Sequence, residues 1–547
     1  MTLFFYFITS SLLTMILIPP LNKYSRYWQM LDTPGERKVH VTDVARVGGI
    51  AMVVGAVLPI LFWSDLDNTV ASFLLGIMVI LFFGVWDDRK QLGYKMKFLG
   101  QAIAVSIVVF YGDISISHLP IVVDYLLPTY IAYPLTFFAL LGVTNAINLA
   151  DGLDGLAGGT TLLSLGVIVL LCLLAGGSDL MFITAGIAGS VLGFLRFNTY
   201  PAVIFMGDAG SQFLGFSVGV LSIMLIEHVN TAVSVALPLL LLGLPLLDTL
   251  IVMAQRVYEG RSPFKPDSNH IHHKLLAVGF DHYEAVGIIY VVQGGFVASA
   301  YFLRYQSDAL ILGVYLAVSA TIIGFFYWVA KTGWRIRSNQ EGNSLTTIHL
   351  LLKNLVDDNH MPKWAFYVTT ATVSLYLLQA GLLSDNIPFD VAILSLLLCC
   401  ILFYYFFKRR HQSFNHLEKM CAYVACTVAL FLTHSIQVGS IELELYNTTL
   451  IGLLTISIIV GIRFSKGRRF DITPLDILAL FIALIGFIIM GDEHQEGNFA
   501  ENVLLLLILF YGVELIVAKL SRLSDIFRIV LFVALAVVGV RGMMLAS

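Results

Sequence analysis

Charged residues are scarce in this chain. Lys, Arg, Asp and Glu make up 12% of its 547 residues, whereas a soluble domain carries about 25%. Hydrophobic residues make up 58%, and the mean hydropathy is +0.86, so a protein surrounded only by water is excluded. Apolar runs of roughly 17 to 25 residues recur along the chain, and in a bilayer each must be a helix, because only a helix satisfies its own backbone polar groups there. The predicted fold class is an all-α polytopic membrane protein.

Cysteine is also scarce, and an excess of basic charge is absent. The five cysteines lie within apolar runs, with neither a metal-ligand spacing nor an extracellular disulfide pattern, which indicates packing residues. The net charge of −4 argues against nucleic acid as a partner. The first apolar run, residues 3–21, has no basic residue before it and no small-residue cleavage site. It is therefore a poor signal peptide.

The distribution of basic residues predicts the orientation. Lys23 and Arg26 follow the first run and place its end in the cytoplasm; with that orientation roughly 30 of the 32 Lys and Arg residues fall on the cytoplasmic side. About eleven helices are expected in a core of residues 1–335, then a cytoplasmic linker at 336–363 and about seven helices in an extension, 364–547, of unknown role. The expected core helices are 3–21, 48–64, 69–86, 98–111, 130–147, 156–176, 181–195, 213–226, 231–254, 284–303 and 310–330. Those of the extension are 365–383, 389–407, 420–438, 447–462, 474–491, 501–518 and 526–543.

Two acidic clusters are predicted at cytoplasmic helix ends of the core. In GVWDDRKQLGYKMKF, the adjacent Asp87 and Asp88 can bind a divalent cation or hold a base, and Lys97 can receive phosphate. Taken alone, the motif fits a solvated helix end equally well. In NAINLADGLDGLAGG, Asp151 and Asp154 are three residues apart and face the same way, with Asn148 just before them. Helix capping is the alternative here, but two Asn and two Asp exceed what a cap needs.

Two further clusters lie on the same predicted side. In RFNTYPAVIFMGDAGSQFLG, Asp208 stands between glycines and can take one position on a metal ion, although a lone Asp there is more often an N-cap. In GRSPFKPDSNHIHHKLL, the histidines do not have a familiar zinc spacing, so contact with phosphate or sugar is favoured over zinc, and loop histidines without function are the alternative. The candidate residues of this cluster are Arg261, His270, His272 and His273.

Asp248 lies within an apolar run, about two turns before Arg256. A charge at that depth costs about 2.5–3.5 kcal/mol on insertion scales. We expect the carboxylate to face the bundle interior, with Arg256 as a candidate partner. Support of the site and a purely structural ion pair are equally compatible with this position.

The clusters together indicate phosphoryl transfer at the membrane. Phosphate anions repel an attacking phosphate, so a divalent cation and fixed positive charges must neutralise charge and align the reactants. Magnesium suits carboxylate ligands best, with manganese as an alternative.

Four motifs, in order and within about 335 residues, resemble one family: DDRxxLxxxxK, NxxNxxDGxDGLAGG, FNxxPAxxFMGDxGSxFLG and SPFxPDxxHIHH. This set is similar to that of the polyprenyl-phosphate N-acetylhexosamine-1-phosphate transferases, the superfamily that also holds the phospho-N-acetylmuramoyl-pentapeptide transferases. The HIHH run resembles the hexosamine-using branch. The first loop, DTPGERKVHVTDVARVGG, resembles the family's at Asp32, Pro34, Arg37, Lys38, His40 and Arg46, but lacks the usual prolines near the arginine.

The resemblance implies a membrane enzyme whose acceptor, undecaprenyl phosphate, attacks the β-phosphate of a UDP-N-acetylhexosamine and releases UMP, with magnesium as cofactor. It implies the inner membrane, a cytoplasmic active site and the first step of a cell-surface polysaccharide such as O-antigen. Catalytic roles are carried over to Asp87, Asp88, Asp151 and Asp154, and magnesium binding to Asp208 and Asp88. Substrate binding is carried over to Lys97, Asn148, Asn198, Phe205, Arg261, His270, His272 and His273.

Two other functions fit part of this pattern. A transporter or flippase of lipid-linked sugars predicts polar residues at mid-membrane depth and related halves, whereas these clusters crowd one face and no internal repeat is found. A non-catalytic scaffold leaves the four clusters without a reason. The sequence does not specify which sugar is transferred or which polysaccharide follows. A one-step and a two-step mechanism are both compatible with it, and so are a monomer and a homodimer.

Overall fold

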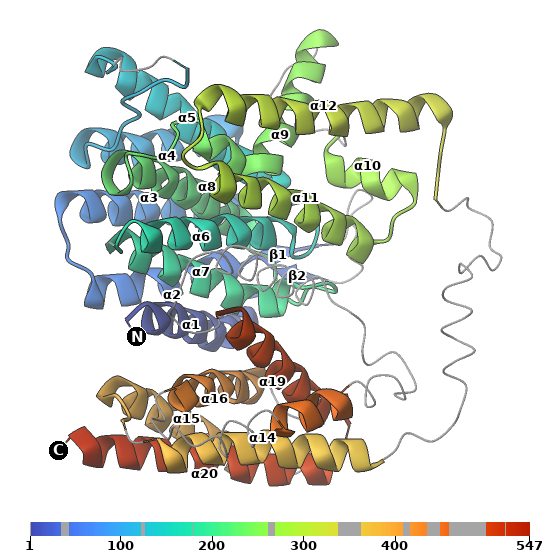
Figure 1. The fold of residues 1–547 in the computed structure, drawn as a ribbon. Helices are drawn as coiled ribbons and strands as arrows, with labels where there is room; N and C mark the ends of the chain where they lie inside the picture. The colour runs from blue at the N-terminus through green and yellow to red at the C-terminus, as the bar shows by residue number, and fades with distance from the viewer. Residues whose placement is uncertain are drawn as a thin grey trace. The chain divides into compact units, whose positions relative to one another are not determined.

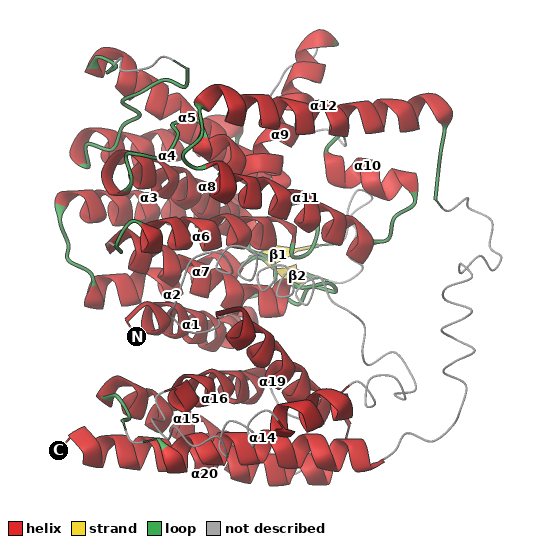
Figure 2. Cartoon of the chain, viewed as in Figure 1, coloured by secondary structure: helices red, strands yellow, loops and turns green. Residues whose placement is uncertain are grey.

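The computed structural model describes residues 2–33, 43–121, 126–177, 179–260, 269–336, 363–384, 386–408, 416–434, 449–458, 499–519 and 521–546. These residues are almost entirely helical (Figure 2). Ten of the described helices are long and apolar enough to cross a membrane. The predicted all-α polytopic membrane fold is therefore confirmed.

The described residues form two compact units. The first contains the helices α1 to α12, and the second those from α14 to α20 (Figure 1). The predicted linker lies almost wholly outside the described residues.

The helices of the first unit follow the apolar runs closely, because helix formation in lipid depends on length and hydropathy. Two of them, α4 and α8, continue into the π-helical turns η1 and η2. The helices are α1 (Thr2–Tyr24), α2 (Gly48–Trp63), α3 (Asn68–Lys90), α4 (Tyr94–Ser106), η1 (Ile107–Tyr111), α5 (Thr129–Ala150), α6 (Leu156–Leu174), α7 (Asp179–Asn198), α8 (Gly207–Met224), η2 (Leu225–Val229), α9 (Leu237–Tyr258), α10 (Ile271–Val278), α11 (His282–Leu303) and α12 (Asp308–Thr332).

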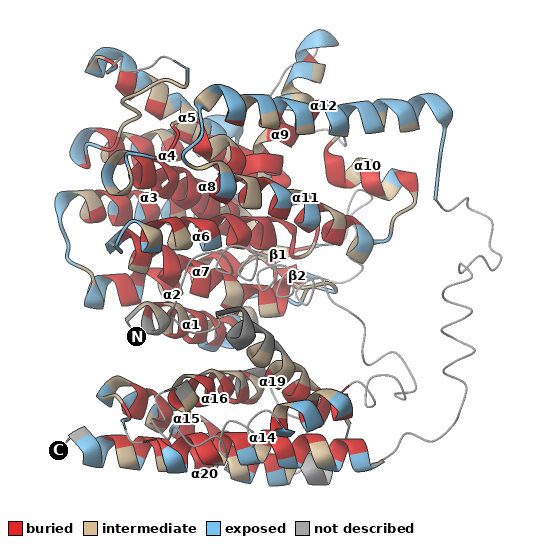
Figure 3. Cartoon of the chain, viewed as in Figure 1, coloured by how far each residue is buried: buried red, intermediate tan, exposed pale blue. Residues whose placement is uncertain are grey.

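Helix α8 lies at the centre of the first unit. It packs against α2, α3, α5, α6 and α9, and its apolar length is fully buried, whereas α12 is mostly exposed (Figure 3). Small residues allow the close approach: a Cβ added to Gly84 would lie 2.4 Å from the Cα of Ala209, and one added to Gly215 would lie 2.7 Å from the Cα of Thr144. Packing of this kind is what holds helices together in lipid.

A two-stranded ribbon attaches the first loop to the start of α8. Strand β1 (Leu31–Asp32) pairs antiparallel with β2 (Val44–Ala45). The Phe205 N–H donates to the Ala45 carbonyl at 2.8 Å, and the Gly48 N–H donates to the Phe205 carbonyl at 3.0 Å. These backbone bonds fix the residues just before α8 against the start of α2.

The second unit contains α14 (Lys363–Leu383), α15 (Phe389–Lys408), α16 (His416–His434), α19 (Phe499–Lys519) and α20 (Ser521–Ala546), with a shorter apolar helix at Thr449–Ile458. The Arg528 guanidinium is buried and pairs with the buried carboxylate of Glu418 at 2.9 Å, which ties α20 to α16. The predicted helix 474–491 lies outside the described residues.

Candidate active site

The carboxylate of Asp88 binds the first turn of α8. It accepts the backbone N–H groups of Asp208 at 2.8 Å and Ala209 at 3.1 Å. Since the N-terminus of a helix carries partial positive charge, an anion there is stabilised. The buried Asp88 thus joins the end of α3 to the start of α8 and fixes the backbone from which Asp208 projects.

Asp87, one residue earlier, faces a different set of groups. Its carboxylate accepts the backbone N–H of Leu92, and its Oδ2 lies 2.5 Å from Nζ of Lys97. The same ammonium lies 3.2 Å from Oδ1 of Asp208. Lys97, on α4, therefore bridges two carboxylates that are 121 positions apart in the chain, and its side chain and that of Asp208 remain 30% and 21% exposed. Both groups are accessible to a ligand.

Asn148, near the end of α5, completes this arrangement. Its Nδ2 donates to Oδ1 of Asp208 at 2.8 Å and to the Ser211 hydroxyl at 2.7 Å. Helices α3, α4, α5 and α8 thus each place a polar side chain around Asp208. We call Asp87, Lys97, Asn148 and Asp208 the acidic centre.

Asp151 and Asp154 lie in the turn between α5 and α6, which we call the DGLDG turn (residues 151–155). Asp151 makes no side-chain hydrogen bond or ion pair with another described residue. Burial, and then the charges of Asp208 and Asp154, raise its pKa to about 7, against the opposing charge of Arg46. Asp154 accepts the Ala202 N–H at 2.9 Å. Asp151 therefore lies within the electrostatic reach of the acidic centre.

Asn198, at the end of α7, contacts this turn, and Phe205 lies just before α8. Asn198 is buried, and its side-chain amide forms hydrogen bonds with the backbone. Its Oδ1 accepts the Gly155 N–H at 2.9 Å, and its Nδ2 donates to the Ile204 carbonyl at 2.9 Å. In this position Asn198 shapes the DGLDG turn and the residues before α8. The ring of Phe205 is partly exposed.

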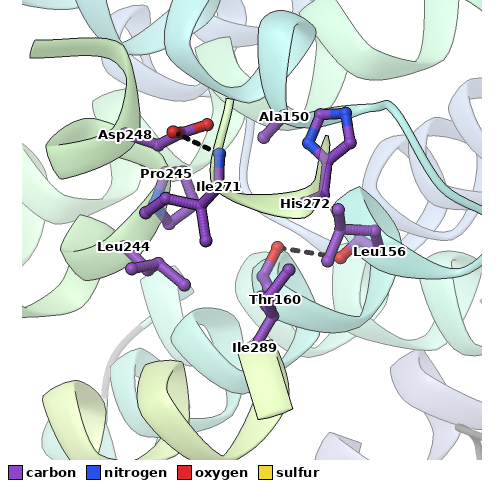
Figure 4. A pocket seen from close by; sticks show the side chains of 9 residues that line it. All are labelled: Ala150, Leu156, Thr160, Leu244, Pro245, Asp248, Ile271, His272 and Ile289. Carbon is purple, nitrogen blue, oxygen red and sulfur yellow. Dashed lines mark hydrogen bonds between the residues drawn. The ribbon is translucent and has the colours of Figure 1, made fainter. Parts of the chain in front are cut away.

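The histidine cluster begins α10, a short helix that the apolar runs did not predict, because eight residues cannot cross a membrane. Asp248 accepts the Ile271 N–H at 2.9 Å (Figure 4). It also pairs with Nδ1 of His270 at 2.9 Å. The expectation that Asp248 faces the interior is met, and the partners found for it are on α10. The predicted pairing with Arg256 is not among the contacts described for Asp248.

His272 packs directly on the DGLDG turn. A Cβ added to Gly152 would lie 2.2 Å from Nε2 of His272. The cavity beside this ring is only about 20 Å³, with Asp248 and Thr160 in its wall (Figure 4), enough for about one water. Burial, and then the charge of His273, lower the pKa of His272 to about 3. The ring is therefore neutral at ordinary pH.

The structure brings the described residues of the four predicted clusters together at one end of the helices of the first unit. Arg261, Pro34, Arg37, Lys38 and His40 lie outside the described residues. Arg46 pairs with Asp32 at 2.5 Å and acts electrostatically on Asp88 and Asp151.

Several residues of this region were not predicted. Tyr290 donates its hydroxyl to the Gly155 carbonyl at 2.7 Å, and Tyr200 stacks on His282 at a ring-centroid distance of 4.2 Å. Gln101 and Gln212 lie below the acidic centre, each four residues after one of its members. A buried tyrosine or amide within an apolar run needs a hydrogen-bond partner. A polar side chain in such a run is therefore the feature by which the sequence could have indicated these residues.

The donor chemistry fits a hard divalent cation. The acidic centre and Asp88 supply three carboxylates. Two of them contact Lys97, and the third accepts backbone N–H groups of α8, so negative oxygen donors are in excess. No group of three or more acidic, histidine or cysteine side chains forms a metal cage among the described residues. Magnesium, however, is usually bound through one or two carboxylates, with water and substrate phosphate completing its shell.

Comparison with known proteins shows which family the chain resembles. Residues 70–226 match the family model described as glycosyl transferase family 4. The chain is 35% identical over 312 residues to the "Probable undecaprenyl-phosphate N-acetylglucosaminyl 1-phosphate transferase" of Bacillus subtilis (strain 168), covering 57% of this chain and 87% of the relative.

Two further relatives have similar names. A decaprenyl-phosphate N-acetylglucosaminephosphotransferase of Mycolicibacterium smegmatis is 34% identical over 53% of this chain and 80% of its own length. The undecaprenyl-phosphate α-N-acetylglucosaminyl 1-phosphate transferase of Escherichia coli (strain K12) is 26% identical over 58% and 87%. Since the motifs, the all-α membrane fold and these relatives agree, the chain belongs to the polyprenyl-phosphate N-acetylglucosaminyl-1-phosphate transferase family.

Proposed function

We propose that this enzyme transfers N-acetylglucosamine 1-phosphate from UDP-N-acetylglucosamine to undecaprenyl phosphate and releases UMP. The observation that carries the proposal is the acidic centre: Asp87, Lys97 and Asp208 come from three helices and meet at distances of 2.5 and 3.2 Å. Lys97 lies between two carboxylates, of which that of Asp208 is partly exposed. Such a group suits a site that receives phosphate next to a cation.

In the proposed reaction an oxygen of the lipid phosphate attacks the β-phosphorus of the donor. The bond between that phosphorus and the bridging oxygen of the pyrophosphate breaks, and UMP leaves with that oxygen. The product is a lipid-linked pyrophosphoryl sugar. Phosphoryl transfer of this type depends mainly on alignment and charge neutralisation. Lys97 would neutralise phosphate charge directly, and Asp208 would do so through the cation that it holds.

Asp208 is the proposed magnesium ligand, with manganese as an alternative cation. Its carboxylate is partly exposed, whereas both oxygens of Asp88 accept backbone N–H groups of α8. This difference favours Asp208 over Asp88 as a ligand and Asp87 over Asp88 as the group that positions the attacking phosphate. Bound magnesium would neutralise charge on the pyrophosphate.

The sugar and nucleotide are proposed to lie over the DGLDG turn, between Asp151 and the histidines of α10. His272 packs on Gly152, and its neutral imidazole can exchange hydrogen bonds with hydroxyl groups. The excess of basic residues on the predicted cytoplasmic side supports an inner-membrane enzyme whose site faces the cytoplasm. We propose that it initiates a cell-surface polysaccharide.

A panel of donors tests the function. Purified full-length protein is incubated with undecaprenyl phosphate, Mg²⁺ and UDP-N-acetylglucosamine, UDP-N-acetylgalactosamine or UDP-glucose, and UMP release is followed. We expect UMP only with an N-acetylhexosamine donor, most rapidly with UDP-N-acetylglucosamine, and none without the lipid. Absence of UMP with every donor would contradict the proposal and favour transport of a lipid-linked sugar.

A further inference from the structure

A second polar layer lies one helical turn below the acidic centre. On α4, Gln101 follows Lys97 by four residues; on α8, Gln212 follows Asp208 by four; on α5, Asn145 precedes Asn148 by three. Residues three or four apart lie on the same face of a helix. Three of the four helices that present the acidic centre therefore each contribute one amide side chain directly beneath it, and we call Gln101, Asn145 and Gln212 the amide layer.

The amides of this layer bond to one another. Gln101 donates to Oε1 of Gln212 at 3.0 Å and to Oδ1 of Asn145 at 3.4 Å, and its Oε1 accepts from Nδ2 of Asn145 at 2.8 Å. Gln101 and Gln212 are each 2% exposed. The reciprocal pair on α4 and α5 and the bond to α8 thus link three helices through one buried side chain.

Buried amides are a poor choice where helices only need to pack together, because an amide without a hydrogen-bond partner lowers stability. A buried amide costs about 1–3 kcal/mol when it is left without a partner, whereas apolar side chains of the same size pack without that risk. Hydrogen bonds, unlike contacts between aliphatic side chains, hold their atoms within a narrow range of distance and angle. The amide layer therefore restricts sliding and rotation of α4, α5 and α8 against one another.

The contacts of the acidic centre depend on that restriction. Lys97 reaches Asp208 at 3.2 Å and Asn148 reaches it at 2.8 Å, and a catalytic arrangement must be held to within about 0.5 Å to be productive. We propose that Gln101, Asn145 and Gln212 are positioning residues that set the geometry of the acidic centre for phosphoryl transfer. This inference rests on the proposed function.

The test separates positioning from folding by comparing a single with a double substitution. Gln212→Leu leaves the Gln101 amide without one partner, so we expect loss of thermal stability together with a fall in kcat of about 10- to 100-fold, while KM for UDP-N-acetylglucosamine stays unchanged. In Gln101→Leu/Gln212→Leu both partners of that bond are apolar, and Asn145 keeps its bond to the Leu141 carbonyl, so we expect stability to recover in part toward wild type while kcat remains low. The double variant also serves if Gln212→Leu does not insert.

Gln293→Leu is the matched control. Gln293 is an equally buried glutamine of α11 that accepts the Leu244 N–H at 2.9 Å and donates to the Ser164 hydroxyl at 3.1 Å, away from the acidic centre. We expect it to lose stability but to keep kcat. Recovery of kcat together with stability in the double variant, or an equal fall of kcat in Gln293→Leu, would overturn the inference. If the wild type releases no UMP the proposed function fails instead, whereas an active wild type with unchanged kcat in Gln212→Leu refutes only the positioning role.

Discussion

Asp87 and Asp88 are adjacent in the chain but contact different groups in the structure. Asp88 accepts two backbone N–H groups of α8, whereas Asp87 contacts the ammonium of Lys97. The sequence predicts both as candidates for catalysis and cannot separate them, because the carboxylate that meets α8 is chosen by how α3 and α8 pack. The sequence likewise does not reveal that the Asn198 side chain bonds to backbone groups. It accepts the Gly155 N–H and donates to the Ile204 carbonyl.

Gly207 provides a test of the Asp88 contact. Its φ is +67°, and an added Cβ would lie 2.4 Å from the Asp88 carboxylate. We expect Gly207→Ala to lower the free energy of unfolding by at least about 1–2 kcal/mol, the cost of the left-handed conformation, and to displace Asp88 from α8. Thermal unfolding in detergent measures the loss, and UMP release should fall with it.

Gly166→Ala is the matched control, since a Cβ on this helical glycine of α6 meets no atom within 4 Å. It should be neutral or slightly stabilising. Equal stability of Gly207→Ala and wild type would show that the contact between Asp88 and α8 does not need a glycine there.

At the scale of elements, long apolar runs were predictable and short or polar ones were not. Helix α8 begins at Gly207, six residues before the predicted start, because Asp88 satisfies N–H groups of its polar first turn. Helix α10 was missed altogether, since its eight residues are held by tertiary contacts with Asp248 rather than by lipid. Hydropathy predicts the membrane-spanning helices. The start of α8 and the short helix α10 depend instead on hydrogen bonds to residues distant in the chain.

The docking of α10 on the DGLDG turn should weaken in acid. The pKa of His272 is about 3 in the folded protein and about 6.5 in an unfolded chain. Below pH 6.5 the unfolded state therefore takes up a proton that the folded state does not, and stability falls by about 1.4 kcal/mol for each pH unit. From pH 7 to pH 5 we expect a loss of up to about 2 kcal/mol from this residue.

Comparison of variants isolates this contribution. His272→Gln should show a smaller drop in melting temperature between pH 7 and pH 5 than the wild type, whereas His228→Gln, at an exposed position, should show the same drop as the wild type. An identical pH response in His272→Gln and wild type would mean that the buried imidazole is not what makes the protein acid-sensitive.

At the scale of the whole molecule, the acidic centre, the DGLDG turn and α10 all belong to the first compact unit. The relatives match 53% to 58% of the chain, and the second unit has its own buried ion pair and helix contacts. Neither the sequence nor the contacts of the second unit assign it a role in the reaction.

Truncation tests how far the first unit is self-sufficient. A chain ending after residue 345 should insert and fold, because α1 to α12 pack against one another in one compact unit. It should also retain UMP release of the same order as the full-length protein. Insertion is measured by monodispersity in detergent. A well-folded truncate without activity would show that the second unit is part of the enzyme.

The central claim is that the carboxylates gathered around Lys97 are the reaction centre, and Asp208→Asn tests it most directly. The variant keeps the shape of the side chain but removes its charge, so we expect kcat for UMP release from UDP-N-acetylglucosamine and undecaprenyl phosphate to fall by about 10²- to 10³-fold or more. Asp179→Asn, at the exposed start of α7, should retain the wild-type rate. A folded Asp208→Asn protein that releases UMP at the wild-type rate would contradict the account.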